Sequence, residues 1–276
     1  MKNYRLLIAI PAVILLVSLA VIANNIAVYG SFMDRSVELT GGTTLTIRPT
    51  AAFDLKAVEN ALPGATVQEA GNLQGSLLII QTKEMDESKV LAAIQPVVQF
   101  APDSVEIGKV EPAIGSIFWA QAQNALIIAF VLMAFVVLVL FRSIVPSFTV
   151  IGCAAIDMIM TVSAISIIGV KLSLPVFAGL LMLVGYSIDT DILLTTRLLR
   201  GMGSLREKIM SAVKTGLTMT TTSLAAVLSL FIFSQGTIIS EIAIVLIVGL
   251  LFDMLNTWIT NVLVLEYWLE RKGQRL

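Results

Sequence analysis

Six stretches of the chain are apolar enough and long enough to cross a membrane. A hydrocarbon core of about 30 Å requires roughly 20 apolar residues in helical conformation. Because backbone groups inside lipid must bond within their own segment, each stretch is predicted to be a helix. The six stretches cover residues 6–23, 120–141, 144–169, 173–194, 213–234 and 239–265. The chain is therefore predicted to be an α-helical polytopic membrane protein, with the lipid bilayer as its surroundings.

The composition agrees with this class and excludes several others. Hydrophobic residues make up 57% of the chain and charged residues 13%, and the mean hydropathy is +0.92. The single cysteine, Cys153, cannot form a disulfide within the chain, and there is no histidine, so zinc and haem are not expected. A nucleotide-binding loop is also missing from the sequence, and neither a cofactor nor a nucleic-acid partner is predicted. The first apolar run is longer than a signal-peptide core and is predicted to be a retained anchor.

The distribution of Lys and Arg predicts the orientation of the helices. Short loops rich in these residues mark the cytoplasmic side of a membrane. The other side carries only Lys171 in its short loops. Three parts follow: a first helix at 1–23, an extracytoplasmic domain at 24–118, and a five-helix bundle at 119–276 whose C-terminus, like the N-terminus, is cytoplasmic. The cytoplasmic side is marked by Lys2, Arg5, Arg142, Arg197, Arg200, Arg206, Lys208, Arg271, Lys272 and Arg275.

Residues 24–118 have the composition and periodicity of an acidic α+β domain. They contain 11 acidic and six basic residues. Alternating apolar runs predict a β-α-β-β-α-β order, which suggests a ferredoxin-like sandwich. Asp54 and Asp86 stand where the two helices should begin and are predicted to cap them. The predicted strands are 37–48, broken at a Gly-Gly pair, 66–69, 76–82 and 104–110, and the predicted helices are 54–62 and 86–99.

Four carboxylates fall inside the predicted spans: Asp157, Asp189, Asp191 and Asp253. Ionisable residues are costly in a membrane and usually mark a functional pathway. One buried aspartate taken singly could instead bond a neighbouring helix and be purely structural. Four in one bundle favour a shared polar pathway, with Asn256 able to bond across helices. A carboxyl group whose surroundings alternate between wet and dry can take up and release a proton, so all four are candidates for a proton relay.

The geometry of a helix places Asp189 and Asp191 on different faces. Residues two apart on a helix point about 200° away from each other, so Asp189 and Asp191 cannot both face the same neighbour. Asp191 shares its face with Ser187, whereas Asp189 follows Gly185 by one turn. The sequence leans toward Asp191 as the solvated carboxylate and leaves the choice open.

The start of the fifth span is also polar. Lys214 can snorkel to the headgroups while the hydroxyls after it bond back to their own helix. The alternative is that Lys214 pairs with one of the aspartates and that the hydroxyls line a path for water or protons. The hydroxyls in question belong to Thr218, Thr221 and Thr222.

Two motifs resemble those of the SecF family, the smaller partner in the SecDF accessory complex of the protein-export translocon, and its archaeal form in particular. After the first span the chain reads Glu38-Leu39-Thr40-Gly41-Gly42-Thr43, which looks like the family's acidic-hydrophobic-x-Gly-Gly-Thr signature. In the fourth span Gly185-Tyr186-Ser187-Ile188-Asp189-Thr190-Asp191 is similar to its Gly-Tyr-Ser-Ile/Val segment. The layout of one anchor, an outer domain and five helices also agrees over nearly the whole chain. The Gly-Gly pair is expected to make a turn or bulge.

The resemblance implies a member of the RND superfamily that forms a heterodimer with a SecD-like subunit. Such a subunit would assist the translocation or release of exported polypeptides at the Sec channel, coupled to the proton gradient, and would not be an enzyme. In bacterial relatives a fourth-helix aspartate and a basic residue opening the fifth helix are implicated in proton flow. These roles fall on Asp189 or Asp191 and on Lys214. The bacterial segment Gly-Tyr-Ser-Ile-Asn-Asp-Thr, matched without a gap, places its aspartate at Thr190, between the two candidates.

Three other functions are compatible with some of these features. A small-molecule transporter subunit of the RND superfamily would also use polar sites at the membrane midplane, although such pumps usually carry larger outer domains. An intramembrane aspartyl protease would use two facing aspartates, but its Gly-x-Gly-Asp signature is missing from the sequence. A scaffold would use the aspartates only to hold a partner's helices.

Overall fold

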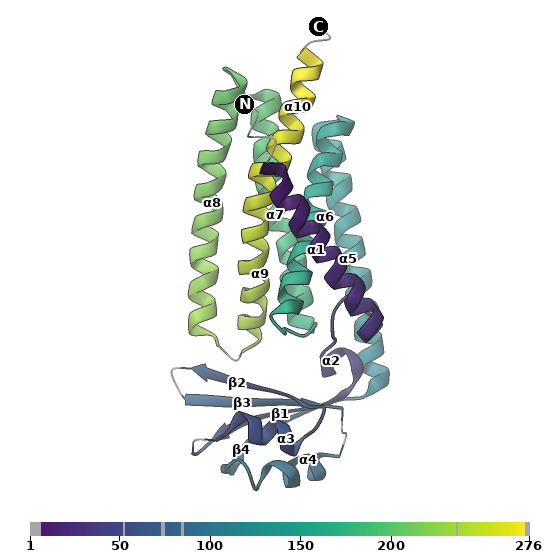
Figure 1. Ribbon diagram of the computed structural model, residues 1–276, viewed down its shortest axis with the longest axis vertical. Helices are drawn as coiled ribbons and strands as arrows, with labels where there is room; N and C mark the ends of the chain where they lie inside the picture. Colours follow the sequence, from purple (N-terminus) through teal and green to yellow (C-terminus); the bar gives the residue numbers. More distant parts are fainter. Residues whose placement is uncertain (1–6, 52, 73–74, 84–85, 236, 274–276) are drawn as a thin grey trace.

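The computed structural model describes residues 7–51, 53–72, 75–83, 86–235 and 237–273. A bundle of long helices stands on a small sheet domain (Figure 1). Within the described residues six helical runs are long and apolar enough to span a membrane, which confirms the expected number. The runs are Ala9–Tyr29, Pro112–Phe141, Ile144–Ile167, Leu174–Arg200, Leu205–Phe233 and Ile238–Arg271.

Two of the spans next to the sheet domain are longer than predicted. Helix α1 (Ala9–Tyr29) continues beyond residue 23 because the buried Asn25 amide bonds to Ser166 Oγ at 2.8 Å and to the Phe32 carbonyl at 3.1 Å. Helix α5 (Pro112–Phe141) begins well before residue 120, with proline in its first turn, where a missing N–H costs nothing. Both helices therefore extend into the 24–118 segment.

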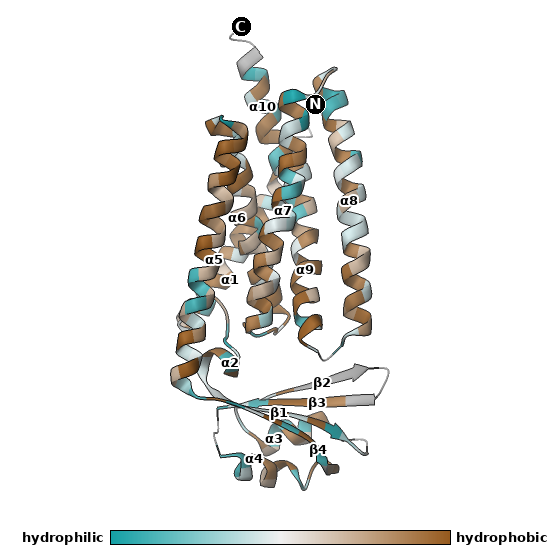
Figure 2. Ribbon diagram, turned by 180° about the vertical axis from the view of Figure 1, so that it is seen from behind, coloured by the Kyte–Doolittle hydropathy of each residue, from teal (hydrophilic) through white to brown (hydrophobic). Residues whose placement is uncertain are grey.

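The remaining helices cross the bundle in alternating directions. They are α6 (Ile144–Ile167), α7 (Leu174–Arg200), α8 (Leu205–Phe233) and α9 (Ile238–Leu255), the last continued by the π-helix η2 (Asn256–Asn261) and by α10 (Val262–Gly273). Helix α8 begins at Leu205 rather than near 213 because Ser204 and Glu207 form a capping box. Helices α7 and α9 pack closely against each other, while α5 and α8 leave most of their side chains exposed. Figure 2 shows the upper half of α5 as almost wholly apolar and that of α7 as interrupted by hydrophilic residues.

The sheet domain has the predicted β-α-β-β-α-β order. Its strands form one antiparallel sheet in the order β2-β3-β1-β4. One face of the sheet packs on the two helices, where Leu45 and Ile80 of the strands and Ile94 of the second helix are all fully buried. Asp54 and Asp86 cap the helices, each accepting the backbone N–H two residues on. The elements are β1 (Gly42–Pro49), α3 (Leu55–Ala61), β2 (Thr66–Asn72), β3 (Gly75–Thr82), α4 (Glu87–Ile94) and β4 (Phe100–Val110).

The first predicted strand is wrong in its first half. Residues 37–40 form a single helical turn, α2 (Val37–Thr40), and the strand begins only at Gly42. Val37 and Leu39 alternate as in a strand, but Val37 packs beside Gly42 and Leu39 joins the cluster of the bundle. Gly41, at φ 85°, turns the chain, and a Cβ there would lie 2.6 Å from the Pro112 Cα. The predicted turn at the Gly-Gly pair is confirmed.

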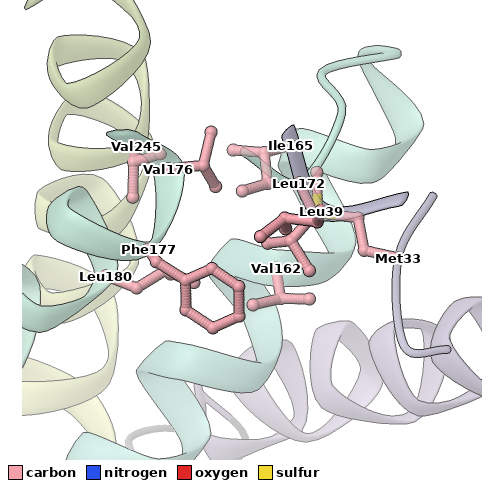
Figure 3. Packing of buried hydrophobic residues seen from close by; sticks show 9 residues of the cluster. All are labelled: Met33, Leu39, Val162, Ile165, Leu172, Val176, Phe177, Leu180 and Val245. Carbon is pink, nitrogen blue, oxygen red and sulfur yellow. The ribbon is translucent and has the colours of Figure 1, made fainter. Parts of the chain in front are cut away.

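A cluster of apolar side chains fastens the segment that leads into the sheet domain, residues 30–41 (the entry segment), to the bundle. Figure 3 shows Met33 and Leu39 from the entry segment against Val162 of α6 and Phe177 of α7. The segment also pairs with the loop before α7, where Ser36 N–H donates to the Leu172 carbonyl at 2.9 Å. The cluster and this hydrogen bond therefore connect the base of the sheet domain directly to the start of α7.

Candidate functional site

Three aspartates meet inside the bundle. Asp157 comes from α6, Asp191 from α7 and Asp253 from α9, and none of the three is exposed. The helices supply a polar shell of hydroxyl and amide groups around them, which is what buried carboxyl groups require. We call this group the aspartate cluster; its shell consists of Ser187, Thr190, Asn256, Thr257 and Asn261.

Asp157 is held from two helices. Its Oδ2 accepts the Ser187 hydroxyl of α7 at 2.7 Å, and its Oδ1 accepts the Asn256 amide at 3.1 Å. The same amide nitrogen donates to the Cys153 carbonyl at 3.1 Å, which fixes the orientation of the side chain. Asp157 is therefore a junction between α6, α7 and the π-helix.

Asp253 and Asp191 are linked through hydroxyl groups. The Thr190 hydroxyl lies 3.0 and 3.1 Å from the two Asp253 carboxyl oxygens. The Thr257 hydroxyl lies 3.2 Å from Asp253 Oδ1 and 3.0 Å from Asp191 Oδ1. The Asn261 amide donates to that same Asp191 oxygen at 2.5 Å. A continuous hydrogen-bonded chain therefore runs from α9 to α7 and on into the π-helix.

The side chains that link the three aspartates have too few donor hydrogens to satisfy every contact if all three carboxyl groups are ionised. A hydroxyl has one hydrogen, so Thr257 can donate to only one of its two carboxyl neighbours at a time. Thr190 meets the same limit, because its hydroxyl also lies 2.8 Å from the Ser187 carbonyl. No basic side chain of the described residues bonds to the cluster, and unpaired buried charges are strongly unfavourable. A hydrogen on either Asp191 or Asp253 would allow the Thr257 hydroxyl to form a hydrogen bond with both carboxyl groups at once.

The π-helix supplies three of the five shell residues and was not predicted. Asn256, Thr257 and Asn261 are all fully buried, and single π-helical turns are often found at functional sites. Of these three residues, only Asn256 was predicted from the sequence to bond across helices. The missed signal was the repeat of polar residues every four positions, at Asp253, Thr257 and Asn261.

The other predicted residues of the spans lie outside the cluster. Asp189 is exposed on α7, and Gly185 and Tyr186 are exposed one turn before it. Lys214 is exposed on α8, and Thr221 is exposed too. The Thr218 and Thr222 hydroxyls are bonded to carbonyls of their own helix at 2.9 and 2.8 Å. The structure thus brings Asp157, Asp191, Asp253, Ser187 and Asn256 together, and it separates the remaining residues from them.

Substitution of Thr257 by valine tests whether the shared hydroxyl holds the cluster together. Valine keeps the shape but removes the hydrogen between two carboxyl groups, and we expect a loss of about 1–3 kcal/mol in the free energy of unfolding. Thermal unfolding of the purified protein measures the change. Thr222→Val, which removes an exposed hydroxyl bonded to its own helix, should stay within about 0.5 kcal/mol of the parent. Equal shifts in the two variants would contradict a special role for Thr257.

Comparison with known proteins places the chain in a family. Residues 89–271 match the family model described as protein export membrane protein SecD/SecF, C-terminal. A protein-export membrane protein SecF from Methanolacinia petrolearia is 36% identical, with 97% of this chain and 95% of the relative covered. Another, from Pyrococcus furiosus, is 38% identical over 96% of this chain and 91% of the relative.

A solved structure shares the fold. The crystal structure of SecDF, a translocon-associated membrane protein from Thermus thermophilus, superposes with a TM-score of 0.77 at 19% identity. The match covers 98% of this chain and 38% of that chain, so this chain spans well under half of the solved one. The family match and the full-length relatives carry the assignment: the chain belongs to the SecD/SecF family of protein-export membrane proteins.

Proposed function

We propose that the chain is an accessory subunit of protein export that uses the aspartate cluster to couple proton movement to its work. The names of its relatives support the export role. The observation that supports the proton coupling is that Asp191 and Asp253 share the hydroxyl of Thr257. A proton on either carboxyl group would complete the line of hydrogen bonds between them. Asp191 is therefore the α7 carboxylate to which we assign the proton-carrying role, together with Asp157 and Asp253.

A SecD-like subunit is the partner that we propose, in a heterodimer. Helix α7 presents an exposed stripe in the middle of its span, the α7 stripe, made of Met182, Gly185, Tyr186 and Asp189. A carboxylate facing lipid at this depth is costly, so a protein neighbour is expected to cover it. The small Gly185 on the same stripe allows another helix to approach closely. Lys214 is also exposed, on the neighbouring α8, and we assign both charged residues to this interface.

The orientation that we propose places the sheet domain outside the cell. Arg197 and Arg200 end α7 at the end of the bundle away from the sheet domain (Figure 1), which agrees with a cytoplasmic location for that end. The sheet domain, with its β-α-β-β-α-β order, is then an extracytoplasmic ferredoxin-like domain. In that position it can contact polypeptides leaving the Sec translocon channel.

The alternatives are less well supported. A small-molecule transporter would be expected to have relatives that are named as pumps. Both relatives described above are instead named for protein export. An aspartyl protease needs two carboxyl groups that share a proton directly. Here the bonds between Asp191 and Asp253 run through the Thr257 hydroxyl. A role without enzymatic activity therefore agrees best with the cluster.

The test is export into membrane vesicles that contain or lack this chain. With the chain and a SecD-like subunit present, we expect transport of a secreted precursor to rise when a proton gradient is imposed. Collapse of the gradient with a protonophore should remove the increase. Stimulation that persists after the collapse would leave the export role in place and contradict the coupling, whereas no stimulation at all would contradict the export role.

A further inference from the structure

A second polar site lies at the outer end of the bundle, between the helices and the sheet domain. It is a pocket of about 200 Å³ whose lining includes Ser36, Lys171, Ser173, Ser240 and Glu241. We call it the outer pocket. Ser36 lines the pocket, and its buried hydroxyl has no hydrogen-bond partner among the described residues, so a water molecule or ion held in the pocket could satisfy it.

Glu241 is the central group of the outer pocket. It lies in the first turn of α9, and its Oε2 accepts the hydroxyl of Ser173, the residue that caps α7. Its charged neighbours are Glu38 of α2, which accepts the Leu174 N–H at 3.1 Å, and Lys171 of the loop before α7. The Lys171 charge is shared, because its ammonium lies 3.4 Å from an Asp34 carboxyl oxygen. Together with the carboxylates of Glu38 and Asp34 beside it, Glu241 outweighs the single ammonium, so the surroundings of the pocket are net acidic and attract cations.

An apolar layer separates the outer pocket from the aspartate cluster. Along α7 and α9 it consists of Leu180, Leu183, Val245 and Leu250, all buried. Figure 3 shows Leu180 of α7 and Val245 of α9, two members of this layer. The two helices touch closely here, since a Cβ on Gly179 would lie 2.9 Å from the Val245 Cβ. The outer pocket, the apolar layer and the aspartate cluster therefore follow one another along α7 and α9.

This order has a chemical consequence for a protein that moves protons. We propose that the outer pocket is the intake from which protons enter from the outer side, with the Glu241 carboxylate as their first acceptor. The inference rests on the proposed proton coupling. A proton passes from a hydronium ion in the pocket to the Glu241 oxygen that Ser173 does not bind, and a water molecule remains. The layer must then open for the proton to reach Asp157 or Asp253, which prevents a continuous leak.

The test measures proton flux into vesicles that contain the complex of this chain and its SecD-like partner, with the outer domain facing the bath. A pH-sensitive dye inside reports flux as the bath pH is varied at fixed inner pH. We expect Glu241→Gln to lower the flux by about tenfold or more and to flatten its dependence on the bath pH. Glu241→Asp should restore part of it. Glu59→Gln, an exposed carboxylate of α3, is the matched control and should leave the flux unchanged.

The outcomes separate this inference from the proposed function. If Asp191→Asn stops the flux and Glu241→Gln keeps the parent's rate and bath-pH dependence, the intake is elsewhere and the coupling stands. If Asp191→Asn also keeps the parent's rate, the coupling itself is overturned. Should Glu241→Gln fail to assemble, Ser36→Ala is measured instead, because it removes an unpartnered hydroxyl without disturbing a bond. A several-fold lower flux supports the intake, and an unchanged flux overturns it.

Discussion

Asp191→Asn is expected to remove the proton-dependent part of export, while the same change at Asp189, two residues earlier, leaves it. Asparagine keeps the size of the side chain and can still bond to Thr257 and Asn261, but it cannot take up or release a proton at this position. Removal of a proton-transferring side chain usually lowers a rate by about 10²–10⁴-fold. Asp189 lies on the exposed side of α7, outside the cluster, so its exchange spares the proton path.

The measurement compares the two variants in the vesicle assay with and without a proton gradient. Both proteins should be present in equal amounts and should retain the partner, as judged by copurification. We expect export in the Asp191→Asn vesicles to match the parent after collapse of the gradient. If instead Asp189→Asn abolishes the stimulation and Asp191→Asn retains it, the assignment of the cluster as the proton path is wrong.

These two aspartates also show which features of the site can be predicted from the sequence and which cannot. Helical geometry alone requires that Asp189 and Asp191 face different neighbours. Which of them faces inward depends on how α7 is rotated against α6 and α9, and that rotation is set by contacts distant in sequence, such as Gly249 against Leu183. The six spans follow from local hydropathy, so they were predicted, whereas the partners of the aspartates depend on packing.

Two other differences between the predicted and the observed structure also depend on more than local sequence. The π-helix at Asn256–Asn261 adds a residue to a turn, so the predicted faces of a regular helix do not hold there. The helical turn at Val37–Thr40 has the alternation of a strand, but Val37 packs beside Gly42 of β1, whereas Leu39 packs into the apolar cluster of the bundle. By contrast, the caps at Asp54 and Asp86 involve only neighbouring residues, and the sequence predicted both.

Gly185→Leu is expected to separate the chain from its SecD-like partner without harming the chain itself. A Cβ at Gly185 would meet nothing within 4 Å, so the folded chain has room for a larger side chain. Leucine is also the better helix former, by up to about 1 kcal/mol, so the stability of the isolated chain should stay the same or rise. In the complex, however, the same side chain would hold the partner's helix away from the α7 stripe.

Copurification of tagged chain and partner measures the effect, and we expect the retained partner to fall by about tenfold, which corresponds to about 1.4 kcal/mol of lost binding free energy. Gly152→Leu is the matched control, because Gly152 lies on α6 and also has open space around its Cβ. If only Gly185→Leu loses the partner, the α7 stripe is the interface and the exposed Asp189 is covered there. Full retention in both variants would place the interface on another face of the bundle. Asp189 would then be a carboxylate that faces lipid, which a membrane-spanning helix rarely tolerates.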